Sequence, residues 1–98
     1  QPFDKYFEAK KISYDESEHM LMGWVWAPSG SYIKAHVHTL QAESITLVRG
    51  KCSIHIMGEA PVILKAGNSI IIDKGRVHNI LFSENTKMMT IWKTDVGG

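Results

Sequence analysis

The sequence predicts an all-β fold, a small sandwich or barrel of short antiparallel strands. Residues that favour turns recur at short intervals, at 28–30, 49–50, 57–61, 65–68 and 73–75. Between these turns lie short runs that are apolar, or that alternate between apolar and polar residues. Such runs are the pattern of buried or half-buried strands. Many short strands with turns between them are typical of a sandwich or a barrel.

Eight segments carry this strand pattern, and none of the turns between them has the composition of a domain boundary. The segments are 20–27, 32–38, 44–48, 52–57, 62–64, 69–72, 77–82 and 88–93. We therefore predict a single domain over residues 1–98. The N-terminal segment 5–12 fits either a helical turn or an edge strand, and the sequence leaves both alternatives open. Residues 96–98 are expected to form a frayed end.

The composition is that of a soluble globular protein, with 44% hydrophobic and 21% charged residues. A formal net charge of +1, with scattered lysines and arginines, argues against nucleic-acid and anionic-membrane partners. No apolar run approaches the roughly 20 residues of a membrane span. The single cysteine, Cys52, excludes an internal disulfide and is compatible with a reducing compartment. We therefore expect a cytoplasmic protein.

The most informative segment runs from Gly30 to Gly50 and contains His36, His38 and Glu43. In a β-strand, residues two apart point to the same face, so the two histidines can approach one point. On a helix they would lie about 200° apart. A second alternating run begins at Glu43 after a short turn. If this run is the antiparallel neighbour of the histidine strand, its carboxylate lies beside both imidazoles.

A third histidine, His78, lies in a later segment that begins at Gly67. Three imidazoles and one carboxylate are a suitable ligand set for a divalent transition metal such as Fe, Mn, Zn, Ni or Cu. If the four side chains converge, His36, His38, Glu43 and His78 form a metal site. Because imidazoles must be neutral to bind a metal, the affinity should fall as the pH drops below about 6.

These residues resemble the first of the two motifs that define the cupins, G(X)5HXH(X)3-4E(X)6G. Gly30, His36, His38, Glu43 and Gly50 match that motif in every position and spacing. In the family, the two histidines and the glutamate of this motif bind the metal.

The second cupin motif, G(X)5PXG(X)2H(X)3N, is matched in part. Gly67, Gly75 and His78 match, whereas Asp73 stands where proline is usual and Phe82 where asparagine is usual. The resemblance implies a small cupin or jelly-roll β-barrel of antiparallel strands, a metal bound by the four matching ligand positions, and a homodimer. It also permits several activities, since sugar isomerases and epimerases, lyases and dioxygenases in the family carry the same ligand set.

Strand parity gives candidates for the wall of a pocket around the metal. Tyr32 and Lys34 share the parity of His36, and Phe82 shares that of His78. A lysine held beside a metal in a desolvated pocket suits general acid–base chemistry, so Lys34 is the candidate catalytic residue. The alternative is an ordinary lysine that faces solvent.

Two further features have two interpretations each. Met20, Met22, Trp24 and Trp26 share one side of their segment, which favours a core face or a dimer interface over a substrate platform. Cys52 is either a small buried hydrophobe, which we favour, or a reactive thiol that lines the pocket.

We predict a metalloenzyme that acts on a small oxygen-rich substrate, as an isomerase or epimerase, a lyase or a dioxygenase. The alternative is a non-catalytic cupin that binds or senses a small ligand through its metal. The remaining histidines, His19 and His55, are predicted not to be ligands. No motif beyond the metal ligands selects one reaction.

Overall fold

The computed structural model describes residues 8–15, 20–39 and 41–94, and every regular element in these ranges is a β-strand. In this part of the chain no helix is long and apolar enough to cross a membrane. The strands are β1 (Glu8–Asp15), β2 (Met20–Ala27), β3 (Tyr32–His36), β4 (Gln41–Arg49), β5 (Lys51–Ile56), β6 (Val62–Lys65), β7 (Ser69–Ile72), β8 (His78–Phe82) and β9 (Thr86–Thr94).

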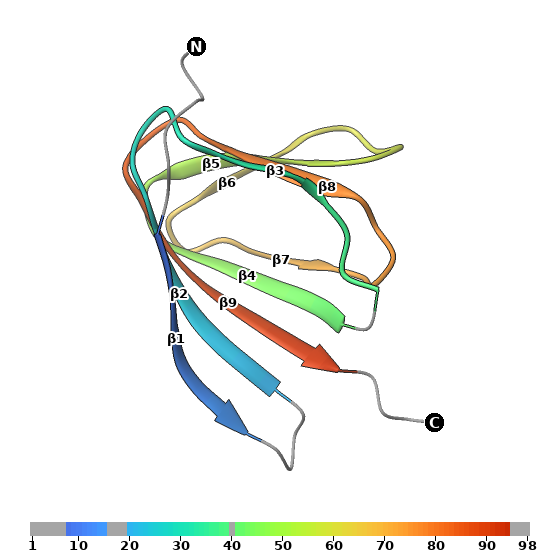
Figure 1. Cartoon of the computed structure of the whole chain (residues 1–98). Helices are drawn as coiled ribbons and strands as arrows, with labels where there is room; N and C mark the ends of the chain where they lie inside the picture. Colours follow the sequence, from blue (N-terminus) through green and yellow to red (C-terminus); the bar gives the residue numbers. More distant parts are fainter. Residues whose placement is uncertain (1–7, 16–19, 40, 95–98) are drawn as a thin grey trace.

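The strands form two antiparallel sheets that face each other (Figure 1). The five-stranded sheet has the order β1-β2-β9-β4-β7, and the four-stranded sheet has the order β3-β8-β5-β6. Consecutive strands often belong to different sheets, so the chain crosses repeatedly from one sheet to the other, as in a jelly roll. The predicted all-β fold class with antiparallel strands is confirmed.

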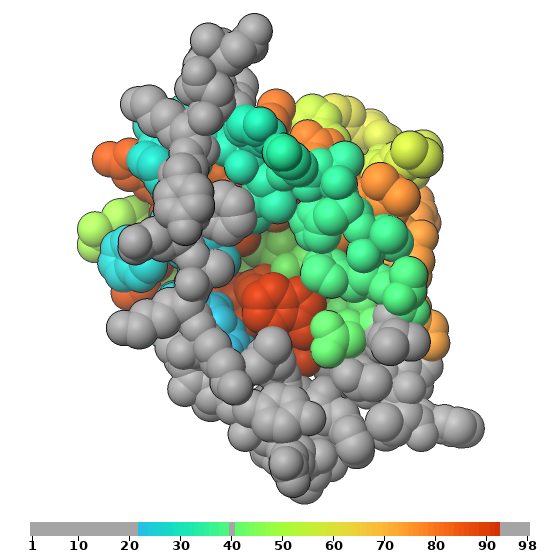
Figure 2. All heavy atoms as spheres, in the orientation of Figure 1, coloured from blue at the N-terminus to red at the C-terminus, as the bar shows by residue number. Residues whose placement is uncertain are grey.

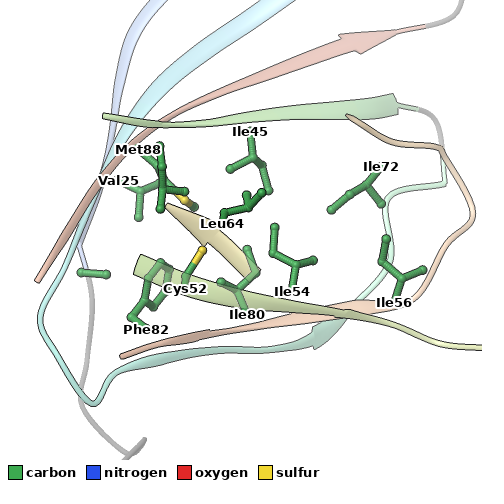
Figure 3. Packing of buried hydrophobic residues seen from close by; sticks show 12 residues of the cluster. Val25, Ile45, Cys52, Ile54, Ile56, Leu64, Ile72, Ile80, Phe82 and Met88 are labelled. Carbon is green, nitrogen blue, oxygen red and sulfur yellow. The ribbon is translucent and has the colours of Figure 1, made fainter. Parts of the chain in front are cut away.

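The hydrophobic core fills the space between the two sheets (Figure 3). Alternate residues of a strand point to the same face, so the inner faces of both sheets can interdigitate. In β5, for example, Cys52, Ile54 and Ile56 are buried, while the residues between them are partly exposed. The five-stranded sheet contributes Val25, Ala27, Ile45, Leu47, Ile72 and Met88, and the four-stranded sheet contributes Cys52, Ile54, Ile56, Leu64, Ile80 and Phe82.

The strand pattern of the sequence predicts the strands well. Each of the eight predicted segments overlaps one strand, and the ends differ by a few residues. The N-terminal segment, which fits two alternatives in the sequence, forms the edge strand β1 from Glu8 onwards and pairs with β2. Residues 5–7 and 96–98 lie outside the described residues.

A bulge in β3 changes which side chains point inward. The register of β3 with β8 shifts between Ile33 and His36. Ile33 packs against the core and His36 joins the candidate site, although their positions have opposite parity. Lys34 lies within the bulge and its side chain is exposed. Parity with His36 therefore does not direct Lys34 into the pocket, because the extra residue of a bulge reverses the alternation.

The aromatic side of β2 faces away from the core. Val25 and Ala27 are buried in the core, so the alternate residues Trp24 and Trp26 lie on the outer face of the five-stranded sheet. Trp26 is 50% exposed. The interpretation that Trp24 and Trp26 form a core face is therefore wrong. Their position on the outer face also keeps both rings away from the interior of the fold. A role in a homodimer interface stays a prediction.

Gly50 forms the whole connection between β4 and β5, which belong to different sheets. Its φ of 94° lies in the left-handed region that glycine adopts without steric cost. A Cβ atom at this position would clash with the backbone oxygen of Asn85 and would lie 2.6 Å from Thr86 Oγ1. The turn therefore requires glycine twice over, for its backbone conformation and for its lack of a side chain.

We expect Gly50→Ala to destabilise the fold more than Gly58→Ala. Both residues have positive φ, but a Cβ at Gly58 would have no atom within 4 Å. Gly58→Ala should cost about 1–2 kcal/mol for the left-handed conformation alone. Gly50→Ala should cost roughly 1–3 kcal/mol more because of overpacking. Urea denaturation of the two variants measures this difference, and equal free energies of unfolding would contradict it.

Candidate metal centre

Four side chains with metal-binding atoms converge at one end of the space between the sheets. They are His36, His38, Glu43 and His78, and their ligand atoms all lie within 4.8 Å of one another. Glu43 and His78 are buried, whereas His36 and His38 are partly exposed. The structure thus brings together the four residues predicted as ligands, in a cluster that could hold a metal ion.

The two sheets contribute different ligands to this four-residue cluster. His36 ends β3 and is the register partner of His78, which begins β8, so both belong to the four-stranded sheet. Glu43 lies in β4 of the other sheet, between β7 and β9. The antiparallel pairing considered for the two motif strands does not form. β3 and β4 belong to opposite sheets, so the Glu43 carboxylate reaches the imidazoles across the interior.

Backbone carbonyl groups orient two of the imidazoles. Nδ1 of His36 lies 2.7 Å from the carbonyl oxygen of Lys34, and Nδ1 of His78 lies 2.9 Å from that of Arg76. Because a carbonyl can only accept a hydrogen bond, each Nδ1 carries the proton. When neutral, both rings therefore present the lone pair of Nε2, which is the arrangement that a metal-bound histidine needs.

Glu43 is a buried carboxylate with two hydrogen-bond donors. Thr90 Oγ1 donates to Oε2 at 2.9 Å, and His78 Nε2 lies 3.1 Å from Oε1. Burial alone would raise the pKa of Glu43, but these two hydrogen bonds and the nearby histidine charges lower it instead. Glu43 is therefore a carboxylate at neutral pH, as a metal ligand must be.

His78 responds to the same contact in the opposite direction. Burial alone would lower the pKa of His78, but the hydrogen bonds to Glu43 and to the Arg76 carbonyl, with the carboxylate charge, raise it. Both ring nitrogens face acceptors, so the metal-free ring is best satisfied as imidazolium. The proton on Nε2 is therefore bound to the same atom that would bind a metal.

His38 differs from the other histidines because its Nε2 atom is buried and has no hydrogen-bond partner. This atom lies 3.7 Å from Glu43 Oε1, beyond hydrogen-bond distance. Burial, together with the charges of His36 and His78, lowers the pKa of His38 against the opposing effect of Glu43. A neutral, unsatisfied ring nitrogen inside a set of donors fits a metal ligand, since a buried polar atom without a partner is otherwise costly.

Two residues of β9 belong to the surroundings of the cluster and are missed by the sequence analysis. Thr90 is buried and holds Glu43. The ring of Trp92 lies 6.3 Å from that of His38, and its indole Nε1 is buried without a hydrogen-bond partner. The alternation of β9 could have placed both on the inner face with Met88, but nothing in the sequence indicates that this face reaches a metal site.

Three other sequence predictions are decided by burial. Cys52 is 1% exposed and burial raises its pKa to about 12, so it is a small buried hydrophobe and not a reactive thiol. Phe82 is the register partner of Cys52 and lies in the core with it, outside the cluster. His55 points to the other face of β5, where its ring nitrogen contacts Ser53 Oγ at 3.1 Å. His19 lies outside the described residues.

The outer surface is hollowed on the side seen in Figure 2. Green atoms from the 30s and 40s of the chain and red atoms from the end of β9 lie around this hollow.

Tyr32 is half-buried as the register partner of Leu81, and Lys34 is exposed. The acid–base role of Lys34 is not tested by these positions and stays a prediction.

Solved structures with the same fold come from several bacteria. KdgF from a Halomonas species has a TM-score of 0.81 and 15% sequence identity, over 90% of this chain and 80% of that one. A cupin-2 domain protein from Shewanella frigidimarina has a TM-score of 0.75 and 21% identity, over 91% and 82% of the two chains. The DMSP lyase DddQ from Ruegeria pomeroyi has a TM-score of 0.80 and 19% identity, over 94% of this chain and 49% of that one.

These identities are low, so the likenesses establish the fold and leave the activity open. No curated protein has a sequence that matches the chain. The sequence-family model of the cupin domain matches residues 23–93, which include both cupin motifs and all four residues of the cluster. The chain therefore belongs to the cupin family.

Proposed function

We propose that the protein binds one divalent transition metal through His36, His38, His78 and Glu43. The observation that carries this proposal is the buried, unpartnered Nε2 of His38 among donor atoms that lie within 4.8 Å of one another. The carbonyl groups that hold Nδ1 of His36 and His78 support it, because they leave Nε2 of both rings available.

A metal in this cluster would act as a Lewis acid that polarises and orients an oxygen of the substrate. The chain supplies the rest of the environment. Thr90 fixes one carboxylate oxygen of Glu43, which leaves the other directed at the histidines. The Trp92 indole beside His38 adds a flat apolar wall and a hydrogen-bond donor without a protein partner.

We infer that the protein is a metalloenzyme for a small oxygen-rich molecule, of the isomerase or epimerase, lyase or dioxygenase type. A DMSP lyase is among the solved structures that share the fold, so a lyase is one of the activities that this fold carries. The alternative is a binding or sensing protein without catalysis. This alternative needs no acid–base residue such as Lys34.

Purified protein should contain about one divalent metal ion per chain. His36→Ala and His78→Ala should each lower the metal affinity by at least about tenfold, because each removes one of the four donors. His55→Ala is the matched control, since His55 is a partly exposed histidine outside the cluster. Elemental analysis after dialysis measures the metal content. Equal content in all four proteins would refute the ligand assignment.

Metal affinity should decrease as the pH is lowered, and the decrease should begin above pH 6.5. The pKa of His78 is raised above its ordinary value of 6.5, so the metal must displace a proton from this ring even near neutral pH. The pKa of Glu43 is lowered, so its carboxylate needs no deprotonation in this range. Each pH unit below the pKa of His78 should weaken binding about tenfold. This onset is higher than the sequence alone predicts.

Competition with a chelator, at several pH values between about 5.5 and 8, measures this dependence. Calorimetry in buffers of different ionisation enthalpy counts the protons released. An affinity that stays constant down to pH 5.5, with no proton release, would contradict the exchange of a proton for the metal on His78.

A catalytic role for Lys34 makes a separate prediction. If its amine transfers a proton, Lys34→Met should lower turnover by about a hundredfold or more while the metal content stays unchanged. Lys65→Met is a control, because Lys65 is also an exposed lysine on a strand but lies in β6. Turnover of the first substrate found, measured beside the metal content, tests the role. Full turnover in the Lys34 variant would exclude it.

A further inference from the structure

The structure contains a cavity at the end of the five-stranded sheet where β2 and β4 end and β9 begins. Its volume is about 430 Å³, within the range of small-molecule sites. Its lining includes Trp26 of β2, Lys87 and Thr86 of β9, Arg49 of β4 and Asn85. None of these residues belongs to the four-residue cluster.

Three of the lining residues form one row across three neighbouring strands. In the register of the sheet, Trp26 is the partner of Lys87, and Lys87 is the partner of Arg49. Like charges directly opposite each other on adjacent strands are destabilising. No ion pair joins either cation to a carboxylate among the described side chains. A negative charge bound between Lys87 and Arg49 would remove this repulsion.

Aromatic rings hold Lys87 in position. Its Nζ atom lies 4.6 Å from the ring of Trp24 and 4.7 Å from that of Trp26. The face of an aromatic ring attracts a cation, so the ammonium group is fixed between the two indoles. Trp26 is 50% exposed and lines the cavity, so part of its indole is open to a ligand.

Asn85 adds a neutral donor on the same side. Its Oδ1 atom accepts a hydrogen bond from the backbone N–H of Ser29 at 2.9 Å. This contact assigns the oxygen, so the amide NH₂ group remains to donate. A guanidinium group matches carboxylate and phosphate oxygens with two parallel hydrogen bonds, and an ammonium group complements them as a point charge.

We propose that this cavity binds a small organic anion with a planar body. A carboxylate or phosphate group lies between Arg49 and Lys87, and the planar part packs against the indole of Trp26. The site is separate from the metal cluster, because Lys87 and Trp26 lie on the outer face of the sheet whereas Thr90 and Glu43 lie inside. The proposal does not depend on the proposed metal function.

Indole N–H signals in the nuclear magnetic resonance spectrum of the purified protein can test this site. The chain has three tryptophans, and Trp26→Phe assigns the signal of interest. Benzoate and phenyl phosphate are the probes, because they share a ring and differ in the anionic group. Benzamide is the neutral control. Benzoate or phenyl phosphate should shift the Trp26 signal saturably with a Kd below about 10 mM, and benzamide should not.

Removing one cation should weaken probe binding by about tenfold or more, because hydrogen bonds to charged groups are the strong ones. Arg49→Gln and Lys87→Gln make this change, and Lys65→Gln is the control from the other sheet. Thermal unfolding confirms that each variant is folded. Which of the two probes binds more tightly identifies the preferred anionic group.

Three results would overturn the proposal. The first is a Trp26 signal that does not respond up to about 10 mM probe, or that responds equally to benzamide. The second is unchanged affinity in Arg49→Gln and Lys87→Gln. The third is a Trp26 signal that depends on protein concentration without probe, which would show that a second copy covers this face.

Discussion

A carboxylate held almost completely out of solvent is the constraint on which the candidate metal site depends. Glu43 is 5% exposed, and a buried charge is tolerated only when it is paired and hydrogen-bonded. Its partners come from different sheets: Thr90 from the neighbouring strand β9, and His78 from β8 across the interior. The two sheets must therefore lie close enough at this end for the side chains of His78 and Glu43 to meet across the interior.

The same strand that carries this carboxylate also builds the core. Ile45 and Leu47 follow Glu43 on the inner face of β4, and both are almost fully buried. The inner face thus changes from charged to apolar within one step of the alternation. The packed side chains beyond Glu43 give the polar cluster a rigid boundary, because close-packed interiors move little. The apolar core is in this sense the support that keeps the ligand atoms together.

How much of this could be predicted from the sequence depends on how local each feature is. The strands and the burial of Cys52 follow from alternation, and the convergence of the four ligand residues follows from the resemblance to the cupin motifs. The position of Lys34 does not, because a single bulge reverses parity. The sequence also does not predict which sheet holds Glu43, because the short connection between β3 and β4 decides which sheet the chain enters. Thr90 and Trp92 carry no motif, and only the three-dimensional pairing of β9 with β4 places them beside the ligands.

Strand β9 shows why two sites can coexist in so small a fold. Its inner residues pass from the core at Met88 to the carboxylate partner Thr90 and then to Trp92. Its outer face presents Lys87 to two indoles. Because successive side chains of a strand point to opposite faces, a substitution on one face leaves the contacts of the other in place. Any coupling between the cationic cavity and the metal cluster would have to pass through the shared backbone of β9 and β4, whose register is fixed by their pairing. The physical expectation is that the two sites act independently.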